Sequence, residues 1–366
     1  MPMPLLIGSC EPFSGKSALV LGLARQLSQR GVRLRFGKPL ATILEAEAGA
    51  SLLDADVQFI GANLGLAADQ LIPSLQELAP ATAEARLLAA DLEPGSAFAA
   101  FQAQLLATAP SEQVILEAAG SLSEGLLYGL SLPQLARSLE AAVVLVHLWH
   151  DSRSVDALLQ AQELLGDRLA GVVLNAVDPE AVPELEATVV PALERLGLTV
   201  FGVMPRSPLL RSVTVEELAR RLEARVLCCR DRLDLLVENL SIGAMNVNSA
   251  MEFFRRRRNM AVVTGADRTD IQLAALEAST QCLILTGAGE PLPQLLNRAE
   301  ELEVPLLKVE QDTLTTVEVI EGAFGHVRLH ESVKATYAVR LVEEHCRFDR
   351  LFQRLGLPVS EGTAPA

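Results

Sequence analysis

Short apolar runs alternate with longer amphipathic stretches through the first two hundred residues. The runs have the length of buried strands, and the stretches show the spacing of helices. This alternation predicts an α/β fold in which a parallel sheet is covered by helices on both faces. The expected strands are 4–8, 32–36, 113–117, 142–147, 170–174 and 199–203, and the expected helices are 18–29, 96–108, 153–165 and 182–196.

The pattern changes near residue 214. A charged, linker-like stretch over 214–230 precedes a second β/α alternation, which predicts a smaller α/β domain. We expect its strands at 234–244, 260–264, 281–286 and 304–309, and its helices at 247–257, 268–279, 291–302 and 313–323.

The last stretch of the chain has a largely apolar stripe at helical spacing. Such a helix packs either on its own domain or on a second copy of the chain, and we expect a homo-oligomer. The stripe is formed by Val333, Tyr337, Leu341, His345, Phe348 and Phe352. The predicted parts are therefore 1–213, 214–330 and 331–366.

Length and composition fit this division. A chain of 366 residues suits two domains, and half of its residues are hydrophobic, enough for large cores. The formal charge of −15 disfavours nucleic acid as a partner. No apolar run has the length of a membrane span and no signal peptide is evident, so we expect a cytoplasmic protein. The spacing of the five cysteines suits neither a disulfide framework nor a zinc site.

One loop carries the strongest chemical signal. Gly8 ends the first strand, and Ser14, Gly15, Lys16 and Ser17 lead into the first helix. In a P-loop, backbone N–H groups and the helix N-terminus hold phosphate oxygens, the lysine reaches the terminal phosphates, and the Ser hydroxyl binds Mg²⁺. The spacing is unusual, because Cys10 stands where the first glycine is expected. The alternative is an ordinary strand-to-helix turn.

Three further candidates follow predicted strands. Lys38 comes after the second strand and can point into the same crevice as the loop. Glu117 ends an apolar strand, as the metal-binding acid of a nucleotide site does. Asn175 follows another strand and has an amide that can contact an adenine edge.

Two candidates have ordinary structural alternatives. Asp56 is either a carboxylate for Mg²⁺ or an acidic residue at a helix N-terminus. His147 lies at a strand end, where we expect it to be packed rather than catalytic.

The second domain contains one concentrated polar turn. Asp267, Arg268 and Thr269 lie between a buried strand and a helix, and a second small loop follows the next strand at 286–289. Open α/β sheets bind ligands at this edge, so these residues are candidates for a small-metabolite site. The alternative is that Asp267 or Thr269 caps the helix.

Together these motifs resemble known families. The series Gly-x₆-Gly15-Lys16-Ser17, Lys38-Pro39-x-Ala41-Thr42, Ala55-Asp56, Glu117-x-x-Gly120, Gly171-x-x-x-Asn175 and Gly202-x-x-Pro205 resembles dethiobiotin synthetase and its cobyrinic-acid-synthase relatives. The run from Val262 to Thr269 resembles the DRTGG domain. The two domains in this order resemble the amino-terminal, regulatory part of long bacterial phosphate acetyltransferases, and we expect no acetyl-transferring domain within these 366 residues.

The resemblance implies a role for each matching residue. Lys16 and Ser17 would bind ATP and Mg²⁺, and Lys38 would lie near the transferring phosphate. Asp56 and Glu117 would hold the metal with Ser17, Asn175 would contact the adenine, and Thr42 would contact the substrate. The sequence departs from the synthetase pattern at Ser9-Cys10-Glu11-Pro12 and at Glu117-Ala118-Ala119-Gly120-Ser121, and Asp270-Ile271 replaces the two glycines of the DRTGG motif.

We therefore expect a regulatory or sensor protein that binds MgATP in its first domain. A weak ATPase or an ATP-dependent synthetase that phosphorylates a carboxylate or carbamate is the alternative, in which Lys16 and Lys38 stabilise the moving phosphoryl group. A third possibility is a partner-binding adaptor with a vestigial nucleotide site.

Overall fold

The computed structural model describes residues 3–41, 53–107, 109, 111–243, 251–252, 254 and 256–358. The chain forms two compact units, residues 1–206 with 328–366 and residues 207–327. Residues 207–213 thus belong to the second unit, and the C-terminal segment, expected as a separate part, belongs to the first. No helix in the described part of the chain combines the length and apolarity needed to cross a membrane.

The first unit is built on a seven-stranded sheet whose neighbouring strands are all parallel, as predicted. The strand β1 lies in the middle, between β6 and β7. Since β1 and β7 are followed by helices on opposite faces, their carboxyl ends mark the edge at which open α/β sheets bind ligands. In spatial order the strands are β4 (Leu71–Ile72), β2 (Arg33–Gly37), β6 (Glu112–Glu117), β1 (Leu5–Ser9), β7 (Ala142–Leu148), β8 (Leu169–Val177) and β9 (Val200–Pro205).

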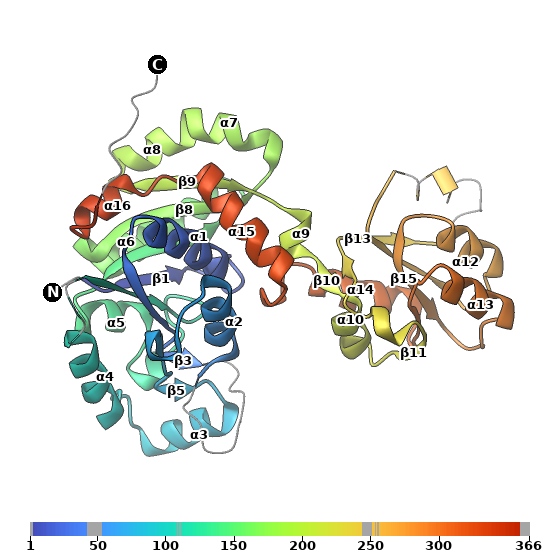
Figure 1. Ribbon diagram of the computed structural model, residues 1–366, viewed down its shortest axis with the longest axis horizontal. Helices are drawn as coiled ribbons and strands as arrows, with labels where there is room; N and C mark the ends of the chain where they lie inside the picture. Colours follow the sequence, from blue (N-terminus) through green and yellow to red (C-terminus); the bar gives the residue numbers. More distant parts are fainter. Residues whose placement is uncertain are drawn as a thin grey trace. The chain divides into compact units, whose positions relative to one another are not determined.

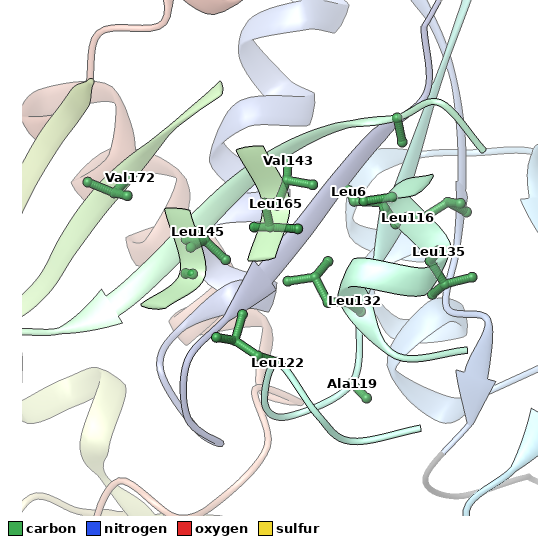
Figure 2. Close-up of a cluster of buried hydrophobic side chains, with 14 of the residues drawn as sticks. Leu6, Leu116, Ala119, Leu122, Leu132, Leu135, Val143, Leu145, Leu165 and Val172 are labelled. Carbon is green, nitrogen blue, oxygen red and sulfur yellow. The ribbon is translucent and has the colours of Figure 1, made fainter. Parts of the chain in front are cut away.

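Helices cover both faces of this sheet (Figure 1). On one face lie α1 (Lys16–Gln29) and α2 (Ala55–Leu64), and on the other lie α5 (Leu132–Ser138) and α6 (Val155–Leu165). Alternate residues of the central strands pack with α5 and α6 into one apolar cluster (Figure 2), because successive strand side chains point to opposite faces. Its labelled members include Leu6, Leu116, Leu132, Leu135, Val143, Leu145 and Leu165.

The rest of the first unit consists of shorter elements. A small sheet of β3 (Leu40–Ala41) and β5 (Gln76–Glu77) follows β2, and β9 is preceded by an irregular helix with a π-helical turn at Leu185–Val189. The other helices are α3 (Pro80–Ala89), α4 (Ser96–Leu106), α7 (Val182–Glu184) and α8 (Val190–Arg195), and 3₁₀ turns lie at Ala68–Gln70, Leu126–Tyr128, Ser152–Ser154, Gly166–Arg168 and Pro179–Ala181.

The C-terminal segment packs on the first unit of its own chain. The helix α15 (Ser332–His345) lies beside α1, and α16 (Asp349–Arg354) follows it (Figure 1). A Cβ atom at Gly22 would lie 2.3 Å from the Cβ of Val342, so the absence of a side chain on α1 allows this close approach. Cys346 continues the contact by forming a β-bridge with Gly202 of β9.

The second unit contains a five-stranded sheet in the order β11-β16-β15-β14-β13, with only β11 antiparallel to its neighbour. Two apolar clusters cover its faces. The strands are β11 (Arg225–Cys228), β16 (Leu306–Lys308), β15 (Thr280–Thr286), β14 (Met260–Gly265) and β13 (Asn239–Ile242), and the helices are α9 (Pro208–Arg211), α10 (Val215–Arg221), α12 (Thr269–Leu276), α13 (Pro293–Glu301) and α14 (Thr313–Ala323), with a 3₁₀ turn at Arg230–Arg232.

Two expectations for this unit were wrong. The stretch 214–230 is no linker, since it holds α10 and β11. The single strand expected over 234–244 is divided into β12 (Leu236–Val237), which pairs with β10 (Val213–Thr214), and β13. Its two halves serve different sheets, which an apolar run does not reveal. The expected helix over 247–257 falls largely outside the described residues.

Candidate functional site at the carboxyl edge of the first sheet

The loop after β1 has a backbone that requires glycine at one point. Gly15, just before α1, has φ 99° and ψ 22°, a left-handed conformation that costs other residues energy. A Cβ here would also lie 2.4 Å from Nδ2 of Asn175. That nitrogen donates a hydrogen bond of 2.7 Å to the carbonyl of Ser14. Asn175 therefore braces the loop from β8, while its predicted contact with adenine stays a prediction.

Lys16 lies under the loop with its amine almost fully buried. Its Nζ donates to Oγ of Ser9 at 3.0 Å, and this oxygen lies 2.8 Å from the carbonyls of both Glu11 and Gly120. Burial lowers the pKa of Lys16, and the nearby carboxylate of Glu117 opposes that effect. A buried ammonium held mainly by neutral oxygens is well suited to bind an anion that enters the loop.

Ser17 and Glu117 meet at the start of α1, as the sequence suggested. The hydroxyl of Ser17 donates to Oε1 of Glu117 at 3.3 Å. Glu117 is 3% exposed, and its second oxygen has no hydrogen-bond partner among the described residues. Burial raises the pKa of Glu117 against the opposing effects of Lys38 and Lys16. A carboxylate oxygen left without a donor beside a serine hydroxyl fits a cation ligand.

Lys38 and Asp56 form a buried ion pair beside this site. Nζ of Lys38 lies 2.5 Å from Oδ2 of Asp56 and 3.5 Å from Asp54. Burial alone would lower the pKa of Lys38, but Glu117, Asp56 and Asp54 raise it overall. Asp54 caps α2 and accepts from the backbone N–H of Asp56 at 2.8 Å, so Asp56 lies in the first turn of a helix, as its structural alternative held.

Two residues that the sequence interpretation missed also contact Asp56. Nε2 of His330 lies 2.9 Å from Oδ1 of Asp56, and Nη1 of Arg328 lies 3.6 Å from the same oxygen. Burial would raise the pKa of Asp56, but the hydrogen bond from His330 and the charge of Lys38 hold it below its usual value. The sequence signal was slight, namely two basic residues just before the predicted C-terminal helix.

The predicted set of metal ligands is only partly assembled. Ser17 and Glu117 are in contact, whereas Asp56 is bound to Lys38 and His330. Across the described part of the chain, no three His, Cys, Asp or Glu side chains form a cluster able to hold a metal. A magnesium ion here would therefore need phosphate and water oxygens in addition to Ser17 and Glu117, as Mg²⁺ in nucleotide sites commonly does.

Two other residues, Gly8 and Thr42, were predicted for this site. Gly8 packs against α5, because a Cβ at this position would lie 2.3 Å from a methyl group of Leu132. Thr42 falls outside the described residues.

The candidate residues of the second unit lie at the edge of its own sheet. Arg268 pairs with Asp270 at 3.4 Å, Asp267 is exposed, and Thr269 begins α12. At the same edge the hydroxyls of Thr286 and Thr313 lie 2.8 Å apart, and the buried amine of Lys308 donates to the carbonyl of Gly287. Arg268, Thr286, Thr313 and Lys308 have partners within the chain, and a ligand site here stays a prediction.

Comparison with known proteins agrees with the two-part motif pattern. Residues 4–214 match the family model of the AAA domain, and residues 217–323 match that of the DRTGG domain. Over 219 residues the chain is 33% identical to the ATP-dependent dethiobiotin synthetase BioD of Pseudomonas aeruginosa, covering 58% of this chain and 92% of the relative. The resemblance inferred from the motifs is confirmed.

A longer relative matches both units. The chain is 24% identical over 379 residues to a phosphate acetyltransferase of Nitratidesulfovibrio vulgaris, covering 96% of this chain and 51% of that protein. The chain thus spans about half the length of this relative. Among solved structures, cobyrinic acid a,c-diamide synthase from Mycobacterium smegmatis with bound ADP and magnesium matches at 19% identity and a TM-score of 0.35, covering 57% of this chain and 88% of that one.

Proposed function

We propose that this chain, which belongs to the AAA domain family through residues 4–214, binds ATP with Mg²⁺ at the loop between β1 and α1 and serves as a regulatory or sensor protein. One observation carries the proposal: the buried Lys16 amine and the Ser17–Glu117 pair flank the start of α1. The phosphates would take the place of Ser9 as the partner of Lys16, and the N-terminus of α1 would stabilise their charge.

Magnesium would be held by Ser17 and by the second oxygen of Glu117, which has no hydrogen-bond partner among the described residues. When bound, the ion neutralises charge on the phosphate oxygens. Asn175 keeps the loop in shape by holding the Ser14 carbonyl. Lys38 supplies a second positive charge on the same side of the sheet. The regulatory role draws support from the DRTGG domain and from the match to half of a phosphate acetyltransferase.

Calorimetric titration with MgATP tests this proposal. We expect wild type to bind, and Lys16→Ala to lose about a hundredfold in affinity, since a charge-assisted contact to phosphate is removed. Arg25→Ala, an exposed position on the same helix, is the matched control and should bind like wild type. Absence of binding to folded wild-type protein would refute the proposal and favour an adaptor with a vestigial site.

An ATP-dependent synthetase is the second candidate, favoured by the identity of 33% to dethiobiotin synthetase. Acceptors that are already carboxylates or carbamates need no general base, and no base is required from the chain. This candidate predicts that ADP forms when MgATP is supplied with diaminopelargonate and bicarbonate or with other carboxylate acceptors. Binding of ATP without ADP formation across such a panel would leave the regulatory function.

A further inference from the structure

Both carboxylate oxygens of Asp56 are occupied by cationic or hydrogen-bonding side chains. Oδ2 accepts from Lys38 at 2.5 Å. Oδ1 lies 2.9 Å from His330 and 3.6 Å from Arg328. Lys38 belongs to the loop after β2, whereas the other two residues come from the segment just before α15, more than 270 positions away. Asp56 is thus held between the sheet edge and the C-terminal segment.

The position of His330 is itself fixed from two sides. Its ring stacks on Phe59, with centroids 5.4 Å apart and planes at 28°. Phe59 lies three residues after Asp56 on α2, so both side chains lie on the same face of that helix. Two residues after His330, α15 begins, and this helix is anchored on α1 through Val342 and Gly22. The contact between His330 and Asp56 is therefore supported by the packing of neighbouring residues within the first unit.

We propose that His330, with Arg328, is a positioning residue that holds Asp56 away from the metal site and so sets how strongly ATP binding depends on Mg²⁺. The inference rests on the proposed function. Asp56 forms no metal-binding cluster with other His, Cys, Asp or Glu side chains among the described residues, so to reach a cation near Ser17 its carboxylate must leave the position in which Oδ1 lies 2.9 Å from His330. Binding of the metal by Asp56 and the contact of Asp56 with His330 therefore oppose each other.

The segment also has a place in the chain that suits regulation. Arg328 directly follows the second unit, which ends at residue 327. Arg328 itself lies 3.6 Å from Asp56, so a displacement of this segment acts on Asp56 directly. Ligand binding that shifts the segment would thus change the metal dependence of the first unit. Such a change would be a population shift between an arrangement in which Asp56 contacts His330 and one in which Asp56 faces the metal.

The test measures ATP affinity as a function of free Mg²⁺ in wild type, His330→Ala, His330→Gln and the exposed-site control Val333→Ala. We expect His330→Ala to lower the Mg²⁺ concentration for half-maximal ATP binding about tenfold, since a hydrogen bond to a charged group is lost. His330→Gln keeps a donor and should stay near wild type, as should Val333→Ala. Metal-free ATP binding should be the same in all four proteins.

Two further measurements separate positioning from general structure. In an Asp56→Asn background, His330→Ala should have no added effect on the Mg²⁺ dependence. If His330→Ala fails to fold, Arg328→Gln is used in its place. Hydrogen exchange of residues 328–331 should speed up with MgATP but not with ATP alone. If His330→Ala binds ATP but needs the same or a higher Mg²⁺ concentration for half-maximal binding than wild type, this inference alone is overturned. Absence of ATP binding in wild type overturns the proposed function as well.

Discussion

Replacing Gly15 with alanine should destabilise the loop in two ways. The first cost is conformational, because φ is 99°. A residue with a Cβ pays about 1–2 kcal/mol in the left-handed region. The second cost is steric, since the new Cβ would lie 2.4 Å from Nδ2 of Asn175, where ordinary contacts begin near 3.4 Å. Overpacking of this kind costs about 1–3 kcal/mol.

The sum predicts that Gly15→Ala destabilises the first unit by about 2–5 kcal/mol. Asn175→Ala removes the colliding amide and leaves Val146 at 3.9 Å as the nearest remaining neighbour. In that background Gly15→Ala should cost only the conformational part, about 1–2 kcal/mol. The coupling energy between the two positions is thus about 1–3 kcal/mol. Asn175→Ala alone should cost about 1 kcal/mol for its bond to Ser14.

Urea unfolding followed by tryptophan fluorescence measures these differences. Trp149 is the single tryptophan of the chain and is buried in the first unit, so its signal reports that unit. Gly31→Ala is a matched control at the other end of α1, because its φ is 76° and a Cβ there would meet nothing within 4 Å. Gly31→Ala should cost the same in both backgrounds. If Gly15→Ala lowers the free energy of unfolding by the same amount in the wild-type and Asn175→Ala backgrounds, the contact between Gly15 and Asn175 is refuted.

Three other predictions concern buried groups. Glu117→Gln should raise the unfolding midpoint of the ligand-free protein at neutral pH, because burial raises the pKa of Glu117 and so disfavours its ionised form in the folded state. The same variant should abolish the part of ATP binding that needs Mg²⁺, because it removes the carboxylate. A lower midpoint without ligand would contradict the expected effect on stability. Burial lowers the pKa of His147 below 6.5, so the unfolded chain binds more protons and stability should fall as pH drops through 6.5 toward 5. In His147→Leu the urea midpoint should fall less over this pH range. A pH profile identical to that of wild type would argue against this role of His147. Val342→Ala should destabilise the first unit by about 1–3 kcal/mol by loss of two buried methyl groups, whereas Val333→Ala, on the exposed face of the same helix, should stay within about 0.5 kcal/mol in the same assay.

The sequence was informative where local pattern determines structure. The loop with Lys16 and Ser17 lies between β1 and α1 as expected, because an apolar run, small residues and a helical stretch follow in order. Glu117 ends β6 beside Ser17, since parallel strands bring their carboxyl ends to one edge. The family resemblance came from several such motifs in order, and the matches to family models bear it out.

Contacts between distant parts of the chain could not be predicted. The close packing of α15 on α1 requires Gly22, and a glycine inside a predicted helix does not by itself indicate which segment packs there. His330 reaches Asp56 only after that packing brings the two segments together. Asn175 lies within β8, and its amide holds the carbonyl of Ser14, a contact that strand order alone does not predict. Its contact with adenine stays a prediction.

The interruption of the first unit by the second has a consequence for biosynthesis. The ribosome releases α1 long before it releases α15, so the face of α1 at Gly22 stays uncovered while residues 207–327 are made. The interrupting unit is contiguous in sequence and can fold as soon as it emerges, whereas the first unit is completed only after residues 328–358 have been made. Nascent chains should therefore complete the second unit before the first.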